Sequence, residues 1–302
     1  MAVINTGTFL KGMFPGVQEW FQKGADDYPL VAPKIFEQRK SAKAWEELVE
    51  YTSFGLAAVK DQGAPGIYDS HVQGDIARFT HLAYENGYQV THEEIADNLY
   101  PALAQSRTKE LRRSMERTRE YVHANILNRA ATAGYNGADG VPLLSIAHAY
   151  KTGITYANRP AVDVALSEAS LEDMLLLSQA VVDSRGNPAM LNAKRLIIHR
   201  NLQFTAARIL GSDYRTAGQL NDINAIKAGG YVPEVVTWQY LTTPTQWFIQ
   251  TDAVAGLITQ DREPVSIRDD NDFETRNAKY KAYMRFSAGW ANPQAVFGTL
   301  GA

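Results

Sequence analysis

The sequence VKDQGAPGIYDSHVQ at residues 59–73 predicts two extended arms joined by a flexible turn. The turn is the Gly-Ala-Pro-Gly segment at 63–66, because glycine and proline favour turns and interrupt regular strands. Polar side chains dominate near this turn, so the hairpin has no core of its own. An isolated two-stranded ribbon is marginally stable in water. We therefore expect another chain to supply the surface that covers it.

The composition is that of an ordinary globular protein, with 302 residues of which 45% are hydrophobic. The formal net charge of −3 does not provide the general attraction to phosphate that a dedicated nucleic-acid binder needs. The absence of cysteine excludes disulfides, thiolate metal sites and a cysteine nucleophile. No signal peptide or membrane-spanning run is evident in the sequence. We expect a soluble protein that is not exported through a membrane.

Residues 1–44 contain six aromatic side chains among scattered glycines and prolines, a pattern too interrupted for one long element. So many aromatic residues are unusual for a disordered leader. We expect an arm that buries its rings on another surface. The candidate anchors are Phe14, Trp20, Phe21 and Tyr28.

A long helix is predicted over Thr91–Ala131, where Thr91 and Glu94 have the spacing of a capping box. Apolar residues recur along it every three, four or seven positions and form a narrow stripe. Pro101 should kink or interrupt the first turns. A thin stripe suits a helix lying across a sheet. A coiled coil fits less well, because the heptad breaks between 103 and 111.

Segment 105–129 of this helix carries seven basic and three acidic residues. Two interpretations stay open. The excess forms a solvated face with pairs such as Arg112 to Glu116, or it docks acidic segments of a neighbouring chain, for instance Asp26 and Asp27 or Glu46, Glu47 and Glu50. The candidate contact residues are Arg107, Arg112, Arg113 and Arg117.

Alternating helix and strand patterns follow, typical of an α+β block. Helices are expected from Ser170, as N-cap, to Gly186, and from Asn201 to Gly211. Buried strands are expected in KRLIIH (194–199), VVTWQYL (235–241) and QWFIQT (246–251). In the last strand, AKYKAYMRFSAGW (278–290), alternate residues face one side of a sheet: Tyr280, Ala282, Met284 and Phe286.

No sequence motif indicates catalysis. Dinucleotide, P-loop and nucleophile-elbow patterns are absent, and HEEIA (92–96) lacks the second histidine of a zinc helix. His148 and His199 stand among apolar residues and are expected to be hydrogen-bonded core side chains. RDDNDFE (268–274) lacks the ligand spacing of a calcium loop and is expected to be a solvated acidic turn. We predict no enzyme activity, metal site or cofactor.

The order of these parts resembles the major capsid proteins of tailed bacteriophages, which share the HK97-type fold. The stretches that carry the resemblance are GYQVTHEEIADNLYP, VHANILNRA, GADGVPLLSIAHA, NRPAVDVALSEASLEDM, TAARIL, NDINAI, YLTTPTQWFIQTD, REPVSIRDDNDFET and RFSAGWANPQAVFGTLGA. The resemblance implies an α+β HK97-like fold. Its parts would be an N-terminal arm (1–44), an E-loop hairpin region (45–90), a P-domain spine helix (91–134), an A-domain (135–245), and P-domain return strands with a C-terminal tail (246–302).

The resemblance also implies a function. It implies a major capsid protein that self-assembles into pentamers and hexamers of an icosahedral phage head around double-stranded DNA, with only loose contact to that DNA. Such a protein is made in the host bacterial cytoplasm and ends in the virion. The E-loop would lie on a neighbouring subunit through its tip: Lys60, Asp61, Gln62, Gly63, Pro65 and Gly66.

Further partners follow from the same resemblance. About ninety residues precede the long helix and leave no room for a fused scaffolding domain, so a separate scaffolding protein is expected, together with a portal. A decoration protein and a covalent cross-link through Lys60 stay open. Two alternatives are an encapsulin-like bacterial compartment and an unrelated soluble α+β enzyme.

Overall fold

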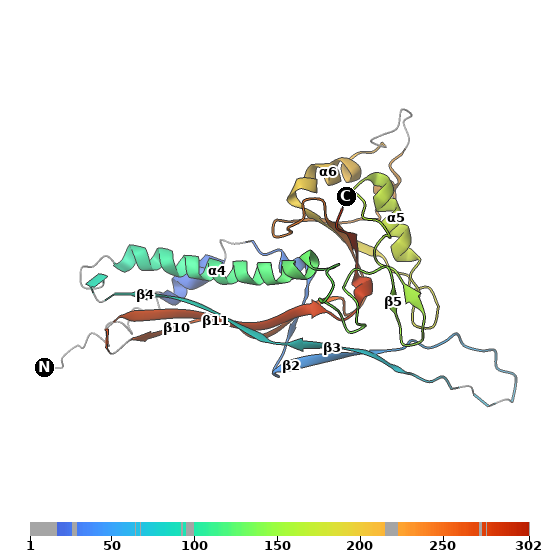
Figure 1. Ribbon diagram of the computed structural model, residues 1–302, viewed down its shortest axis with the longest axis horizontal. Coiled ribbons are helices and arrows are strands. Elements are labelled where there is room, and N and C mark those ends of the chain that lie inside the picture. Colours follow the sequence, from blue (N-terminus) through green and yellow to red (C-terminus); the bar gives the residue numbers. More distant parts are fainter. Residues whose placement is uncertain are drawn as a thin grey trace.

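The computed structural model describes residues 17–25, 29–63, 65–66, 68–91, 93–94, 100–214, 223–271, 274–275 and 277–301. Figure 1 shows three parts: an elongated body in which a long helix lies along a sheet, a compact block at one end, and a hairpin that projects away from both. The mixture of helices and sheets confirms the predicted α+β class.

The elongated body is built on a four-stranded sheet in the order β1-β10-β11-β4. Strand β10 (Leu257–Asn271) pairs in parallel with β1 (Glu37–Lys40) and antiparallel with β11 (Ala278–Trp290), which pairs antiparallel with β4 (Leu82–Val90). The predicted alternation in β11 is confirmed. Tyr280 and Met284 are buried, whereas Lys281 is exposed. One face of the sheet therefore belongs to the core.

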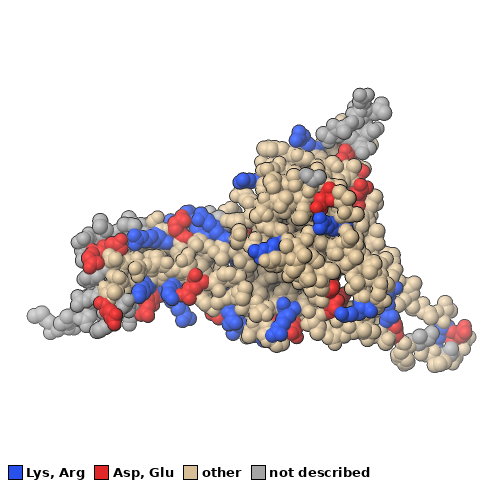
Figure 2. All heavy atoms as spheres, viewed as in Figure 1, with Lys and Arg blue, Asp and Glu red and all other residues tan. Residues whose placement is uncertain are grey.

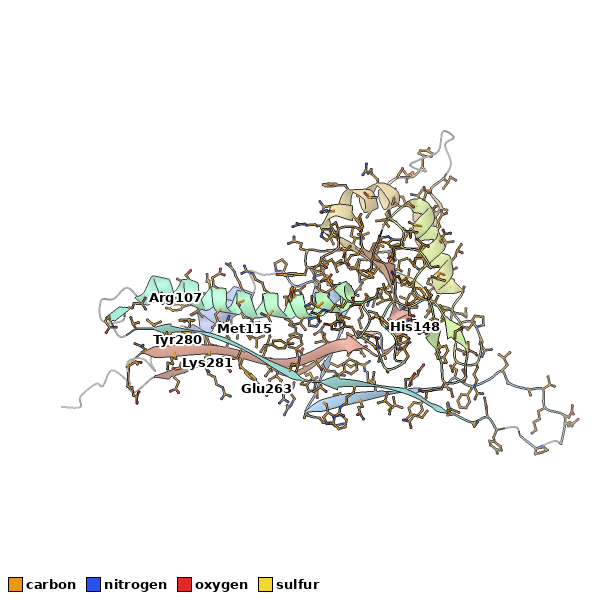
Figure 3. All side chains as sticks on the ribbon, in the orientation of Figure 1. Arg107, Met115, His148, Glu263, Tyr280 and Lys281 are labelled. Atoms are coloured by element: carbon orange, nitrogen blue, oxygen red, sulfur yellow. The ribbon has the colours of Figure 1, made fainter. Side chains whose placement is uncertain are left out.

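Helix α4 (Tyr100–Asn128) covers that face. Leu111 and Met115 pack with the buried residues of β11, and Figure 3 shows Met115 on the sheet side of the helix. The predicted capping box is confirmed, because Thr91 and Glu94 each accept a hydrogen bond from the other's backbone N–H, at 3.3 and 3.2 Å. The described part of the long helix begins at Tyr100.

Pro101 lies in the first described turn of α4. Proline is tolerated in the first helical turn, where its missing N–H has no intrahelical acceptor. Of the segment before it, 93–94 are helical and 95–99 lie outside the described residues.

The compact block contains a second sheet, in the order β12-β9-β7-β8. Its strands are β7 (Ala193–His199), β8 (Val235–Trp238), β9 (Trp247–Thr251) and β12 (Val296–Thr299). Leu196 and Ile198 face one cluster with α5 (Glu168–Gln179) and α6 (Gln203–Gly211), while Ile197 faces the other, with the end of α4. The sheet is thus buried on both faces. Strands β9 and β12, which fall within the segment 246–302, pair in this sheet and not in the long one.

The first block helix also differs from its prediction. Ser167, not Ser170, is the N-cap of α5: its side chain accepts from the Ser170 backbone N–H at 3.1 Å, and the Ser170 hydroxyl accepts from the Ser167 N–H at 2.9 Å. The helix ends at Gln179. Gly186, with a φ of 85°, lies in a turn that the bridge between Val182 and Pro188 encloses. Helix α6, preceded by a 3₁₀ turn, lies where the second helix was expected.

The projecting hairpin consists of β2 (Trp45–Tyr51) and β3 (Gln73–Thr80), joined by residues 52–72. The predicted hairpin region extended to residue 90, but the chain turns at His81 and β4 joins the long sheet. The prediction of an acidic turn at 268–274 was wrong in part, since Arg268–Asn271 form the end of β10. None of the helices in the described residues has the length and hydropathy needed to cross a membrane.

Candidate assembly surfaces

The hairpin loop, residues 52–72, is fixed at its base. Thr52 closes the ribbon: its backbone N–H donates to the Val72 carbonyl at 3.0 Å, and its hydroxyl accepts from the Val72 N–H at 2.9 Å. Arg185 of the block donates to the Ser53 and Ser70 carbonyls at 3.0 and 2.6 Å. Asp69 accepts from the Gly55 and Ser70 N–H groups, and these hydrogen bonds lower the pKa of its carboxyl group. The base of the loop is therefore ordered by contacts within the chain.

The outer part of the hairpin loop has no such support. Leu56, Val59 and Tyr68 are 86%, 94% and 96% exposed. Within the described residues, no hydrogen bond or ion pair joins a side chain of 56–68 to the rest of the chain. The predicted tip residues Lys60, Asp61, Gln62, Gly63, Pro65 and Gly66 are all exposed, and Figure 1 shows this end projecting beyond the body. Large apolar side chains thus stand in water far from any core.

These apolar loop residues are the ones that sequence reasoning missed. The prediction concentrated on the polar tip, whereas Phe54, Leu56, Val59 and Tyr68 provide most of the apolar area that a partner could bury. Phe54 stacks edge-on against His71, with ring centroids 4.0 Å apart. Their occurrence as large apolar residues in an otherwise polar loop, on both sides of the Gly-Ala-Pro-Gly turn, is the signal that could have identified them.

The four arginines predicted as a contact face do not form one surface. Arg107 binds Glu94 at 3.3 Å, and Arg113 and Arg117 bind Glu110 at 2.7 and 3.8 Å. Arg112 forms a buried pair with Glu116, and its guanidinium lies 5.1 Å from the ring centre of Phe21. The predicted pairing of Arg112 with Glu116 is confirmed, but the pair is buried and not solvated. Docking of a neighbour by the four arginines stays a prediction, and Arg112 is the one largely covered within its own chain.

The N-terminal arm is partly integrated into its own chain. Residues 17–25 form a helix, and Phe21 is 1% exposed because it packs with Leu111 and Met115 of α4. Trp20 is partly buried against the same cluster. The surface that buries Phe21 is therefore α4 of the same chain. The other two predicted anchors, Phe14 and Tyr28, lie outside the described residues, as do Asp26 and Asp27.

A buried carboxylate ties the arm and block to the helix. Glu120 of α4 accepts hydrogen bonds from the backbone N–H groups of Val31 and Ala32, both at 2.8 Å. Its other oxygen accepts from the Trp238 indole N–H at 2.7 Å. Burial raises the pKa of Glu120, and these donors oppose the rise. Local sequence patterns could not predict this junction, because its members are distant along the chain.

A cavity of about 140 Å³ lies where the ribbon meets the block. Three carboxylates line it: Glu50 from β2, Asp75 from β3 and Asp139 from the loop after α4. Lys151 binds Asp75 at 2.7 Å, and His148 contacts Asp139 at 2.5 Å. Burial, followed by repulsion from Asp75, raises the pKa of Glu50. At the base of the hairpin, burial and the neighbouring carboxylate therefore disfavour the ionised form of Glu50.

The histidines behave as predicted. His148 is 1% exposed and hydrogen-bonded to Asp139 and Asn158. His199 is buried and accepts from the Asn201 backbone N–H at 3.1 Å. Among the described residues, no group of three His, Asp or Glu side chains is arranged to hold a metal ion.

Comparison with known proteins places this architecture in a family. The family model for the phage capsid protein matches residues 78–298, most of the chain. The chain belongs to this family. It is a phage major capsid protein with an HK97-like α+β fold, and the compartment and enzyme alternatives are not favoured. Its role is structural, and its place is the virion. A comparison with curated proteins found no significant match.

Solved capsid structures share the fold at low sequence identity. The capsid of Cyanophage P-SCSP1u has a TM-score of 0.58 and 9% identity, covering 91% of this chain and 88% of that one. The capsid of a native GTA particle has a TM-score of 0.56 and 11% identity over 91% and 92% of the two chains. The Microbacterium phage Oxtober96 structure has a TM-score of 0.54 and 12% identity over 91% and 92%.

Proposed function

We propose that this capsid protein self-assembles into pentamers and hexamers of an icosahedral head that encloses double-stranded DNA. In this assembly, the hairpin loop of each copy lies on a neighbouring copy. The observation that carries the proposal is the outer part of the hairpin loop, where Leu56, Val59 and Tyr68 have no cover within their own chain. Burying these side chains against a second copy would remove on the order of several hundred Å² of apolar surface from water. This is a substantial part of the roughly 800 Å² that each partner buries in a standard protein–protein interface.

A contact of the hairpin loop with a neighbouring copy can be repeated from copy to copy. A hairpin loop that docks on a different surface of the next copy makes a heterologous contact, which forms rings or closed shells when the rotation closes. The net charge of −3 is consistent with loose contact to packaged DNA, because there is no overall attraction to phosphate. In this proposal, the elongated body is the P-domain with α4 as its spine helix, the compact block is the A-domain, and the hairpin is the E-loop.

Other partners belong to the same proposal. A separate scaffolding protein guides assembly, and a portal occupies one vertex. The protein is made in the host bacterial cytoplasm before it enters the virion.

The experiment replaces Leu56, Val59 and Tyr68 together by serine. We expect subunit stability within about 0.5 kcal/mol of wild type, because exposed positions contribute little to folding, and we expect no closed shells in electron micrographs. Val162→Ser, at an apolar residue that is 75% exposed in the block, is the matched control. Normal shells from the triple variant would refute the role of the hairpin loop.

A further inference from the structure

The outer face of α6 combines an exposed aromatic ring with cationic side chains. Phe204 is 70% exposed. Arg208, one helical turn on, is exposed and donates through Nε to the Phe204 carbonyl at 3.3 Å. Arg200 precedes the helix and is also exposed. Neither arginine forms an ion pair with any residue that the structure describes. We call these three residues the α6 knob.

A groove of matching character lies between α5 and α7 (Ala225–Gly229). It has a volume of about 360 Å³, and its apolar lining consists of Leu175, Leu176, Ala225, Ile226 and Tyr231. Leu176 and Tyr231 remain 63% and 51% exposed. The Tyr231 ring lies against the Gly229 backbone, where an added Cβ would fall 2.2 Å from it. The ring is thereby held at the edge of the groove.

Acidic side chains border this groove. Glu172 lines it, and Asp173 follows on the exposed side of α5. Neither forms an ion pair within the described part of the chain. Figure 2 shows acidic side chains gathered over α5 and basic ones at the α6 edge of the block. An apolar groove with an acidic rim is complementary to an aromatic ring flanked by arginines.

The two surfaces are separate within one molecule. Helices α5 and α6 both lie at the outer end of the block (Figure 1). None of the three knob residues lines the groove of its own chain. A contact between two different surfaces of identical molecules is heterologous and closes into a ring at a suitable rotation.

We propose that the α6 knob of one copy docks in the α5–α7 groove of a second copy. Phe204 occupies the apolar floor, and Arg200 and Arg208 lie opposite Glu172 and Asp173. This inference rests on the proposed self-assembly and names the surfaces that join neighbouring blocks. Aromatic and arginine side chains in the centre of an interface commonly provide most of its binding energy.

The test is a charge exchange with rescue. The knob variant is Arg200→Glu with Arg208→Glu, and the groove variant is Glu172→Arg with Asp173→Arg. Each alone should raise the protein concentration needed for half-maximal assembly by about tenfold or more, while the fourfold variant should recover assembly. Phe204→Ser leaves the charge of the knob unchanged and should weaken assembly through loss of the apolar contact alone. Lys194→Glu, at an exposed cation outside both surfaces, is the control.

Three readouts separate the outcomes: sedimentation for assembly, thermal melting for folding and electron microscopy for shape. Rescue in the fourfold variant supports the contact, as does assembly when the knob variant and the groove variant are mixed with each other, because the acidic knob of one then faces the basic groove of the other. Loss in both single reversals without rescue would show that the surfaces bind a different protein, and would overturn the proposal. If the wild type and all variants assemble into shells equally well, the proposal is also overturned. If the wild type itself never assembles, the proposed function is refuted instead.

Discussion

The Glu120–Trp238 hydrogen bond offers a prediction whose size follows from the structure. Trp238→Phe removes the indole N–H that donates at 2.7 Å and leaves one oxygen of a carboxylate that is 1% exposed without a donor. A lost hydrogen bond to a charged group costs about 1.5–3 kcal/mol. The smaller ring also leaves space in a fully buried site, so the total loss of unfolding free energy should be about 2–4 kcal/mol.

A double-mutant cycle isolates the hydrogen bond from the packing. Glu120→Gln keeps one acceptor oxygen for Val31 and Ala32 but turns an amide donor toward the indole N–H. In that background, Trp238→Phe removes a donor-to-donor conflict, so its cost should shrink. We expect a coupling free energy of about 1–3 kcal/mol, measured by urea unfolding of the unassembled subunit. A coupling below about 0.5 kcal/mol would refute this account of the junction.

Three further predictions concern the other sites. Arg112→Glu should destabilise the subunit by about 3–5 kcal/mol, because it breaks a buried pair. Arg113→Glu, which breaks a partly exposed pair, should change the unfolding free energy by less than about 1 kcal/mol. Equal urea midpoints of the two variants would contradict this. The raised pKa of Glu50 means that its contribution to stability is fully present below its unfolded value and is lost as pH rises through the folded value. Glu50→Gln should therefore remove a decline in melting temperature between those two pH values. A difference in melting temperature between wild type and variant that does not change with pH would argue against this. Deleting Gln62–Ile67 should leave the melting temperature unchanged but prevent shell closure, and normal particles in electron micrographs would count against that.

Local patterns were sufficient to predict some of the fold. The alternation in β11 and the reciprocal bonds of Thr91 with Glu94 depend on residues a few positions apart, and both are confirmed. The N-cap of α5 was misplaced because Ser167 and Ser170 both precede acidic residues, so local chemistry permits either one. Only the reciprocal hydrogen bonds in the structure distinguish them.

Contacts between distant segments could not be predicted from local patterns. The partner of β4 is β11, nearly two hundred residues later, so strand propensity alone attached 82–90 to the hairpin. The excess of basic residues in α4 predicted an exposed contact surface. The periodicity of α4 alone could not show that the helix at 17–25 covers Arg112 with Phe21. The same holds for the buried contacts of Glu120, the exposure of Phe204 and the α5–α7 groove, which depend on how distant segments pack together.

The most direct test of the account is a density map of the particles formed by the purified protein, produced with its scaffolding protein where assembly requires one. The account predicts closed icosahedral shells in which residues 52–72 of each copy are covered by an adjacent copy. Shells in which this loop remains in solvent, or a protein that stays monomeric at high concentration, would contradict it.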